Sequence, residues 1–299
     1  MTNSGPSLEK LTLLLDWFVN PDHAPIVAAE SIGAFAEMGL EVEIIQSDDP
    51  SLPPHRLADR QADLAMNYQP ELHLLVDAGL PLVRVGTIID TPLATVAALQ
   101  SSGIKQMADF KGKRMGCAVT GVDTVTLEAM LKSSGIALAD ITMVNVNFQL
   151  VSALIAGDVD GVVGGYRNFE ATEIREHGGE PILFNVEDFG VPTYEELIVV
   201  AHRDTLGDPK IAKFLAAVQK GTDYLLAEPQ QSWGRFLQAY PALDNNLNRT
   251  AWKDTLPLFA RDPLALDTTR YETYGKFLFD NKLIGKLPPV GDYAVQLAR

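Results

Sequence analysis

The apolar positions of this chain fall into short runs that alternate with stretches of helical spacing and with turn residues. The apolar run at 11–15 predicts a buried strand, and apolar residues at helical spacing over 24–38 predict a helix that Gly39 ends. The predicted strands are 11–15, 42–45, 63–66, 82–88, 95–98, 115–119, 142–146, 161–163 and 197–201. The predicted helices are 24–38, 54–60, 70–78, 123–134, 150–156, 208–227, 229–239, 250–260 and 267–283. This alternation indicates an α/β protein with parallel sheets.

An internal similarity indicates that the pattern occurs twice. LADRQADLAM (57–66) resembles LIAGDVDGVV (154–163), with Asp63 and Asp160 at equivalent positions before a strand. A chance match between two α/β units is the alternative. We expect two lobes, each with a mostly parallel sheet, joined by two crossovers with a ligand cleft between them. The predicted division is lobe 1 at 1–95, with 201–299 returning to it, and lobe 2 at 96–200.

Composition and charge narrow the range of partners. Of the 299 residues, 46% are hydrophobic and 21% are charged, which is ordinary for a globular protein. The net charge of −15 argues against nucleic acid or an anionic membrane surface as a partner. No apolar run is long enough to span a bilayer, so we expect no membrane insertion. Cys117 is the only cysteine, which excludes an intrachain disulfide.

A carboxylate and two aromatic residues follow the first predicted strand. Asp16, Trp17 and Phe18 stand where the strand 11–15 ends, and ligands of open α/β sheets lie beyond the carboxyl ends of the strands. These three residues are therefore candidates for a ligand crevice. The alternative is a Trp-Phe pair that packs in the core under a loop.

The segment GGYRNFE (164–170) is the strongest candidate for ligand chemistry. Tyr166 and Glu170 are four residues apart, so they share a face if the segment opens a helix. An aromatic ring with a carboxylate one turn away suits a flat heterocycle that carries an amine. Gly164 and Gly165 allow close approach of backbone or ligand. A Tyr-Glu pair on a solvated helix face is the alternative.

Weaker candidates follow other strands. Asn67 and Tyr68 come after strand 63–66, and Thr120 stands in a strand-to-helix turn whose amides would favour an anion or a plain cap. In GVPTYEEL (190–197), Tyr194 and Glu195 are candidates to reach the cleft, unless the segment is only a hinge turn. The histidines are scattered and no nucleophile motif is present, so we expect no metal site and no catalytic residue.

Four segments together resemble the thiamine-pyrimidine-precursor family. They are LLLDWFVNPDHAPIVAA (13–29), KGKRMGCAVTG (111–121), GGYRNFE and GVPTYEEL. That family includes solute-binding proteins of ABC transporters and eukaryotic pyrimidine synthases. The resemblance implies a type II periplasmic-binding-protein fold, whose two lobes close on a small heterocyclic ligand, and an ABC permease as the partner.

Two departures separate this chain from the synthase branch. The synthases resemble this chain but use a lysine and a histidine after the strand at 63–66, where this chain carries Asn67 and Glu71. They also carry a cysteine-rich CCCFC stretch where this chain has GVPTYEEL. The resemblance therefore implies no synthase chemistry and no cofactor.

The binding-protein branch implies a role for individual residues. By that resemblance, Trp17 would stack on a pyrimidine, Tyr166 would form the opposite wall, and Glu170 would accept from the 4-amino group. The residues implied as further contacts are Asp16, Asn67 and Tyr194. The expected ligand is an aminopyrimidine thiamine precursor of the hydroxymethylpyrimidine or formylaminopyrimidine type.

Several alternatives stay open. The same broad group includes proteins that resemble riboflavin or sulfonate binders. A cytoplasmic enzyme of pyrimidine metabolism and a sensor module are two further possibilities. The resemblance implies a periplasmic or extracellular location, whereas the polar start of the sequence shows no signal-peptide pattern and leaves a cytoplasmic location open.

Overall fold

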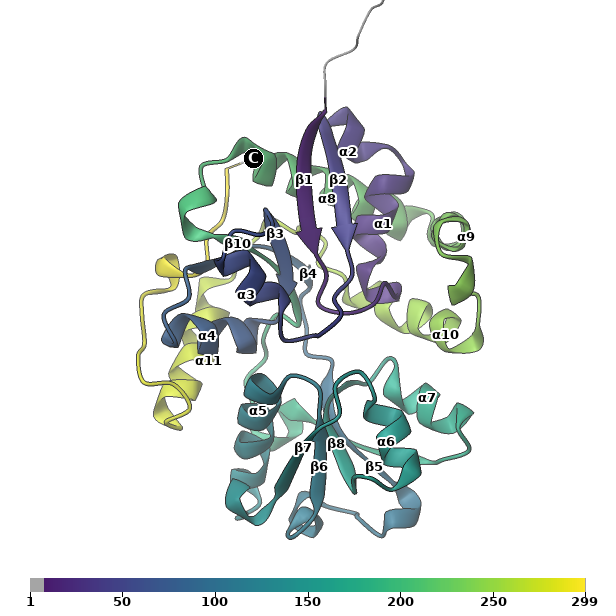
Figure 1. Cartoon of the computed structure of the whole chain (residues 1–299), viewed down its shortest axis with the longest axis vertical. Helices are drawn as coiled ribbons and strands as arrows, with labels where there is room; N and C mark the ends of the chain where they lie inside the picture. The colour runs from purple at the N-terminus through teal and green to yellow at the C-terminus, as the bar shows by residue number, and fades with distance from the viewer. Residues whose placement is uncertain (1–7, 299) are drawn as a thin grey trace, which may run out of the picture.

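The apolar runs of the sequence form two five-stranded sheets in the computed structural model, which describes residues 8–298 (Figure 1). The first sheet has the order β2-β1-β3-β10-β4, formed by β1 (Glu9–Leu14), β2 (Leu40–Ile45), β3 (Leu64–Asn67), β4 (Leu82–Ile89) and β10 (Leu197–His202). The second has the order β7-β6-β8-β5-β9, formed by β5 (Ala94–Leu99), β6 (Arg114–Cys117), β7 (Thr142–Asn145), β8 (Gly161–Tyr166) and β9 (Pro181–Asn185). Each sheet is the base of one lobe.

One strand in each sheet runs against the other four. β10 is antiparallel to β3 and β4, and β5 is antiparallel to β8 and β9. These are the strands by which the chain enters each lobe from the other. The chain leaves the first sheet after Ile89 and returns to it at Leu197. Both crossovers between the sheets therefore lie a few residues before the predicted boundaries at 95 and 200.

The two predicted internal repeats have the same hydrogen bonds. Asp63 accepts from the Thr12 amide at 2.8 Å, and Asp160 accepts from the Arg114 amide at 2.8 Å. In both lobes, therefore, an aspartate just before one strand (β3 or β8) binds the backbone of the adjacent strand (β1 or β6). The sequence similarity between the two units reflects a shared structural role.

The helices differ from the prediction mainly at their ends, except that α7 (Glu170–Glu176) is absent from the predicted helices. They are α1 (Ala24–Ser31), α2 (Ala34–Glu37), α3 (Pro53–Ala58), α4 (Gln69–Asp77), α5 (Thr120–Ser133), α6 (Leu150–Ala156), α7 (Glu170–Glu176), α8 (Pro209–Ala227), α9 (Pro229–Ala239), α10 (Asn246–Thr255) and α11 (Thr268–Asp280). The single helix predicted over 24–38 is wrong: it is divided at Gly33, which has a left-handed φ of 76°. The helix predicted at 250–260 begins earlier, because Asn245 caps α10 by accepting from the Asn248 amide at 2.9 Å.

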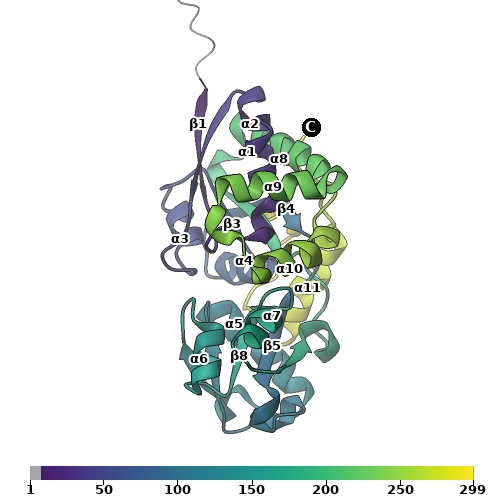
Figure 2. The same cartoon turned by 90° about the vertical axis from the view of Figure 1, so that its right-hand side faces the viewer.

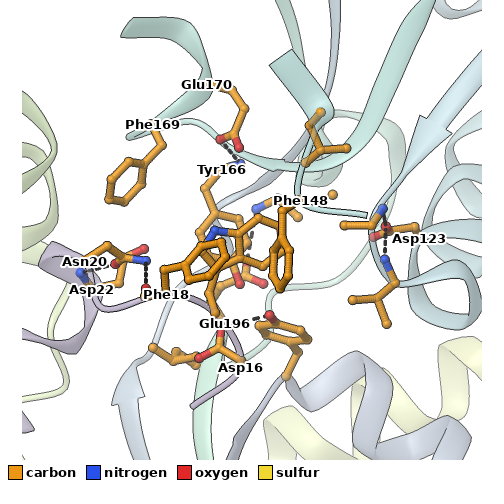
Figure 3. A pocket seen from close by; sticks show the side chains of 18 of the residues that line it. Asp16, Phe18, Asn20, Asp22, Asp123, Phe148, Tyr166, Phe169, Glu170 and Glu196 are labelled. Carbon is orange, nitrogen blue, oxygen red and sulfur yellow. Dashed lines mark hydrogen bonds between the residues drawn. The ribbon is translucent and has the colours of Figure 1, made fainter. Parts of the chain in front are cut away.

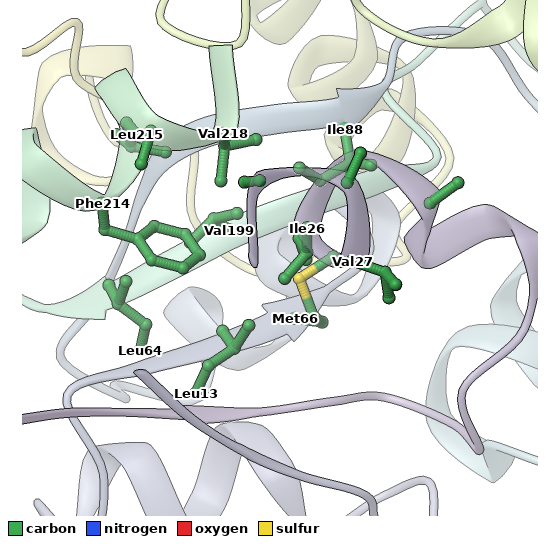
Figure 4. Packing of buried hydrophobic residues seen from close by; sticks show 14 of the residues in the cluster. Leu13, Ile26, Val27, Leu64, Met66, Ile88, Val199, Phe214, Leu215 and Val218 are labelled. Carbon is green, nitrogen blue, oxygen red and sulfur yellow. The ribbon is translucent and has the colours of Figure 1, made fainter. Parts of the chain in front are cut away.

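The core of the first lobe lies between its sheet and the helices α1 and α8 (Figure 4). Ile26 of α1 and Phe214 of α8 are buried against Val199 of β10, which lies between β3 and β4. The two helices approach closely at Gly221, where an added Cβ would lie 2.3 Å from the Pro25 carbonyl oxygen. The apolar face of this sheet is thus covered partly by helices that follow β10 in the sequence.

The segment after β10 also contacts the second lobe on two sides (Figures 1 and 2). Asn246 of α10 donates to Glu176 of α7 at 2.7 Å. Tyr274 of α11 packs its ring against Tyr194, with centroids 5.3 Å apart. Within residues 8–298, none of the helices combines the length and the apolar character that crossing a membrane requires.

Candidate functional site

A cavity of about 360 Å³ lies between the lobes, at the ends of β1, β3 and β8 (Figure 3). Seven of the nine residues predicted to bind a ligand line it: Asp16, Trp17, Phe18, Tyr68, Tyr166, Glu170 and Tyr194. Both lobes contribute, as expected for polar residues that follow strands facing a common crevice.

The other two predicted residues do not line the cavity. Asn67 is buried, and its side-chain oxygen accepts from the Tyr68 amide at 2.5 Å. Thr120 is exposed at the start of α5, where its hydroxyl oxygen accepts from Asn145 at 3.2 Å. Each therefore has a local structural partner, and a part in ligand binding stays a prediction for both.

Asp16 is held rigidly at the base of the cavity. Its carboxylate accepts from the Tyr68 hydroxyl at 2.8 Å and from His23 Nε2 at 3.0 Å. His23 Nδ1 accepts from the Asn20 amide at 3.2 Å, so the proton of the neutral imidazole is on Nε2. This network fixes the turn that carries Trp17 and Phe18.

An aromatic cluster joins the two lobes at the cavity. The ring of Phe148, on the turn between β7 and α6, lies edge-on to Trp17 at 4.4 Å and tilted against Phe18 at 4.5 Å. Phe18 is 48% exposed, so this group lies at the surface of the crevice rather than in a core under a loop. The sequence analysis missed Phe148, because nothing local in the sequence places this turn opposite Trp17.

The glycines of GGYRNFE make room for carboxylates. Gly164 has a φ of 85°, and a Cβ there would lie 2.2 Å from Asp123 Oδ1. A Cβ on Gly165 would lie 2.8 Å from Glu170 Cγ. Glu170 turns back to accept from the Tyr166 amide at 2.5 Å. Both carboxylates therefore approach the end of β8 at distances that a larger residue would block.

Tyr166 presents its hydroxyl without a protein partner. The ring is perpendicular to that of Tyr68, with centroids 6.4 Å apart. Its buried hydroxyl makes no hydrogen bond to the described residues. Since buried hydroxyls are normally bonded, this group is a candidate contact for a ligand.

The acid of GVPTYEEL that faces the cavity is Glu196, and the expectation for Glu195 was wrong. Glu195 points to the opposite side, where it pairs with the buried Arg84 at 3.2 Å. Glu196 accepts from the Ala94 amide at 2.9 Å, from the Leu93 amide, and from the Tyr194 hydroxyl at 3.1 Å. Side chains alternate along an extended chain, which would have grouped Tyr194 with Glu196.

The cavity wall is acidic. Burial raises the pKa of four lining carboxyls above their ordinary values: Asp22 to about 6, Asp123 to about 7, Glu196 to about 7 and Glu170 to about 8. In the part of the chain that the structure describes, neither lysine nor arginine lines the cavity. A bound cation or hydrogen-bond donor would lower these pKa values and stabilise the ionised carboxylates, so the wall favours a ligand of that kind.

Residues that follow β10 complete one side of the cavity. Leu243, Leu247 and Asn248, at and before α10, all line it. The sequence analysis assigned this segment to lobe 1 but no part of it to the site. Over residues 8–298, no group of three or more histidine, cysteine, aspartate or glutamate side chains is arranged to hold a metal ion.

A family model described as NMT1/THI5-like matches residues 20–232. The chain belongs to the NMT1/THI5-like family. This confirms the resemblance found in the sequence. The family match ends before α10, so the side of the cavity formed by Leu243, Leu247 and Asn248 lies outside it.

Relatives of this chain carry names of three kinds. A Haemophilus influenzae protein named for thiamine biosynthesis is 44% identical over 97% of this chain and 92% of its own length. The formylaminopyrimidine-binding protein of Halalkalibacterium halodurans is 30% identical over 76% of this chain and 69% of its own. A 4-amino-5-hydroxymethyl-2-methylpyrimidine phosphate synthase of Uromyces fabae is 29% identical over 91% of this chain and 84% of its own length.

Solved structures agree with the expected fold. The alkanesulfonate-binding protein SsuA from Xanthomonas axonopodis pv. citri superposes with a TM-score of 0.75, covering 98% of this chain and 99% of its own, at 16% identity. The predicted periplasmic-binding-protein fold is confirmed.

Proposed function

We propose that this protein is the solute-binding component of an ABC importer and binds an aminopyrimidine precursor of thiamine. The observation that carries the proposal is the cavity itself, where aromatic residues of both lobes surround buried carboxylates. Its volume of about 360 Å³ is within the range of small-molecule sites. The name of the Halalkalibacterium halodurans relative supports the same ligand class.

Glu170 is the residue proposed to recognise the amine. Its Oε2 accepts from the Tyr166 amide, which fixes the carboxylate beside the Tyr166 ring. Oε1 remains to accept from the exocyclic amine or a protonated ring nitrogen of a pyrimidine. The unpartnered Tyr166 hydroxyl offers a second polar contact on the same wall.

Residues at the synthase positions argue for binding rather than synthesis. Asn67 stands where the synthases use a lysine, so no Schiff base can form there. Glu71, at the histidine position, is 6% exposed, and burial raises its pKa to about 8. A synthase reaction would therefore need groups that these two positions do not supply.

A sulfonate ligand, the runner-up, fits the wall less well. A sulfonate carries a permanent negative charge and would require arginine, lysine or free backbone amides. The cavity offers Asp22, Asp123, Glu170 and Glu196 in their place. As part of an importer, the protein would act in the periplasm or at the outer cell surface with a permease as its partner.

A titration that follows tryptophan fluorescence and melting temperature tests the proposal. The panel is hydroxymethylpyrimidine, its formylaminomethyl relative, thiamine, riboflavin and taurine. We expect micromolar or tighter binding of one aminopyrimidine, with a fluorescence change that Trp17→Phe removes and Trp233→Phe retains. Trp233 packs on Trp252 at 5.0 Å, outside the cavity, and is the matched control.

Substitution of Glu170 tests its role. Glu170→Ala should weaken binding of the aminopyrimidine by about 1.5–3 kcal/mol, the usual contribution of a hydrogen bond to a charged group. Glu170→Gln keeps an acceptor oxygen and should lose less. Equal affinity of Glu170→Ala and the unchanged protein would refute the assignment, and binding of riboflavin or taurine alone would refute the ligand class.

A further inference from the structure

Three pairs or single groups of backbone amides at the cavity are occupied by carboxylates of the chain itself. Asp123 accepts from the amides of Ala118 and Val119 at 2.8 and 2.9 Å, in the turn between β6 and α5. Glu170 accepts from the Tyr166 amide at the end of β8. Glu196 accepts from the Leu93 and Ala94 amides at the start of β5.

Amides in turns that lead into helices are sites where proteins commonly bind phosphate and other anions. Here the Asp123 carboxylate already occupies two of the amides, those of Ala118 and Val119, that such an anion would use. Gly164 makes this possible, since a Cβ at that position would collide with Asp123 Oδ1. Gly164 on β8 therefore leaves the space in which the Asp123 carboxylate binds the Ala118 and Val119 amides after β6.

The charge of the wall acts in the same direction. Asp22, Asp123, Glu170 and Glu196 all line a space that, in the described chain, no lysine or arginine enters. Arg167, close in sequence, is bound to Glu187 by two hydrogen bonds of 2.7 and 2.8 Å and does not line the cavity. An anionic group in the cavity would therefore meet acidic side chains and an amide pair, Ala118 and Val119, that Asp123 already occupies, with no lysine or arginine of the described chain to pair with it.

From this arrangement we infer that Asp123 and Glu196 are specificity residues that exclude phosphorylated ligands, so that the site accepts only the unphosphorylated, neutral or cationic aminopyrimidine. This inference rests on the proposed function for the identity of the ring, and extends it to the charge of the substituent. It separates this chain from the relatives that are named as synthases, whose names give a phosphate ester as the product.

The test compares hydroxymethylpyrimidine, its phosphate monoester, its aminomethyl analogue and methanesulfonate by calorimetry and thermal shift. The unchanged protein should bind the alcohol and the aminomethyl compound. It should bind the phosphate ester at least about 100-fold more weakly, since the buried phosphate would lack a counter-ion. Methanesulfonate should not bind. Binding of the ester within about threefold of the alcohol would overturn the inference while leaving the proposed function intact.

Two substitutions at one position separate the amides from the charge. Asp123→Ala frees the Ala118 and Val119 amides. It should reduce the ratio of the affinity for the alcohol to the affinity for the ester by about tenfold or more, and it should allow methanesulfonate to bind. Asp123→Asn keeps an oxygen on those amides and should not gain methanesulfonate binding. Glu128→Gln, which removes a charge from the same helix outside the cavity, should leave the ratio unchanged.

The remaining outcomes are also decisive. A folded Asp123→Ala protein with an unchanged ratio and no affinity for methanesulfonate would overturn the inference. If Asp123→Ala does not fold, Glu196→Gln takes its place and must reduce the ratio. If no pyrimidine binds at all, the proposed function fails. Methanesulfonate then decides: binding by the unchanged protein overturns the exclusion of anions, and a gain only in Asp123→Ala supports it.

Discussion

The side-chain amide of Asn168, on the loop before α7, donates a hydrogen bond of 2.8 Å to Asp22 Oδ1 in the other lobe. The same amide donates to the Thr255 hydroxyl oxygen at 2.7 Å, and that hydroxyl lies 2.9 Å from Asp22 Oδ1. All three side chains are buried. Since they come from both lobes, this cluster stabilises the closed arrangement and would be broken when the lobes separate.

Asn168→Ala should therefore weaken ligand binding mainly by speeding release. The loss should be about 1.5–3 kcal/mol, because the change leaves Asp22 buried without its amide donor. Stopped-flow measurement of ligand dissociation checks this. Asn246→Ala removes the exposed bond to Glu176 between the same lobes and, as the control, should cost less than about 1 kcal/mol. Equal effects of the two variants would show that burial of the Asp22 cluster does not matter.

Phe148→Ala tests the aromatic contact between the lobes. Loss of the contacts with Trp17 and Phe18 should weaken binding by about 0.5–1.5 kcal/mol, the range for aromatic pairs beyond their buried area. Calorimetry with the aminopyrimidine measures this. Phe189→Ala, in the same lobe but outside the cavity, should bind with unchanged affinity. An unchanged affinity in Phe148→Ala would show that the contacts of Phe148 with Trp17 and Phe18 do not contribute to ligand binding.

The core of the first lobe predicts a large stability effect at Phe214. This side chain is fully buried on α8 and stacks on Phe35 with centroids 5.4 Å apart. Phe214→Ala should lower the free energy of unfolding by about 3–5 kcal/mol, as for other buried phenylalanines. Urea unfolding measures it, with Phe279→Ala, 43% exposed on α11, as a control within about 0.5 kcal/mol of the unchanged protein. A small effect at Phe214 would mean that α8 does not help to stabilise this lobe.

Local patterns in the sequence were sufficient to predict nine of the ten strands of the described chain and the residues at their ends. Asp16, Trp17 and Tyr166 line the cavity because each follows or ends a strand whose apolar run is continuous and buried. The strand β9 was missed although it contains three consecutive apolar residues, 182–184; it is short and lies half-buried at a sheet edge. The division between α1 and α2 was missed because the apolar spacing does not reveal the left-handed backbone of Gly33.

The rest of the site depends on contacts between distant parts of the chain. Phe148 faces Trp17 across the two lobes, and Leu247 reaches the cavity from a helix that follows both sheets in sequence. The approach of Asp123 to Gly164 requires the packing of α5 beside β8. No pattern within one segment contains these relationships, although side-chain alternation would have selected Glu196 over Glu195.

The buried acids predict that stability falls as pH rises. Burial raises the pKa of Glu71 from 4.5 to about 8, with smaller contributions from the charges of Asp123 and Asp16. A carboxyl with a raised pKa binds its proton more strongly in the folded state. The folded state is therefore progressively destabilised as pH rises from about 4.5 to about 8, and the loss is constant above that range. The melting temperature of the ligand-free protein should fall between pH 5 and pH 8.

Glu71→Gln isolates this effect, because glutamine has nearly the same shape and no charge to bury. The variant should melt above the unchanged protein at pH 8, by about 2–4 °C for each kcal/mol gained, and the two should converge at pH 5, where Glu71 is protonated. Glu41→Gln, at an exposed position of β2, is the control and should follow the unchanged protein at both pH values. If Glu71→Gln shifted the melting temperature equally at pH 5 and pH 8, its effect would come from packing, and ionisation of Glu71 would not limit the stability of the fold.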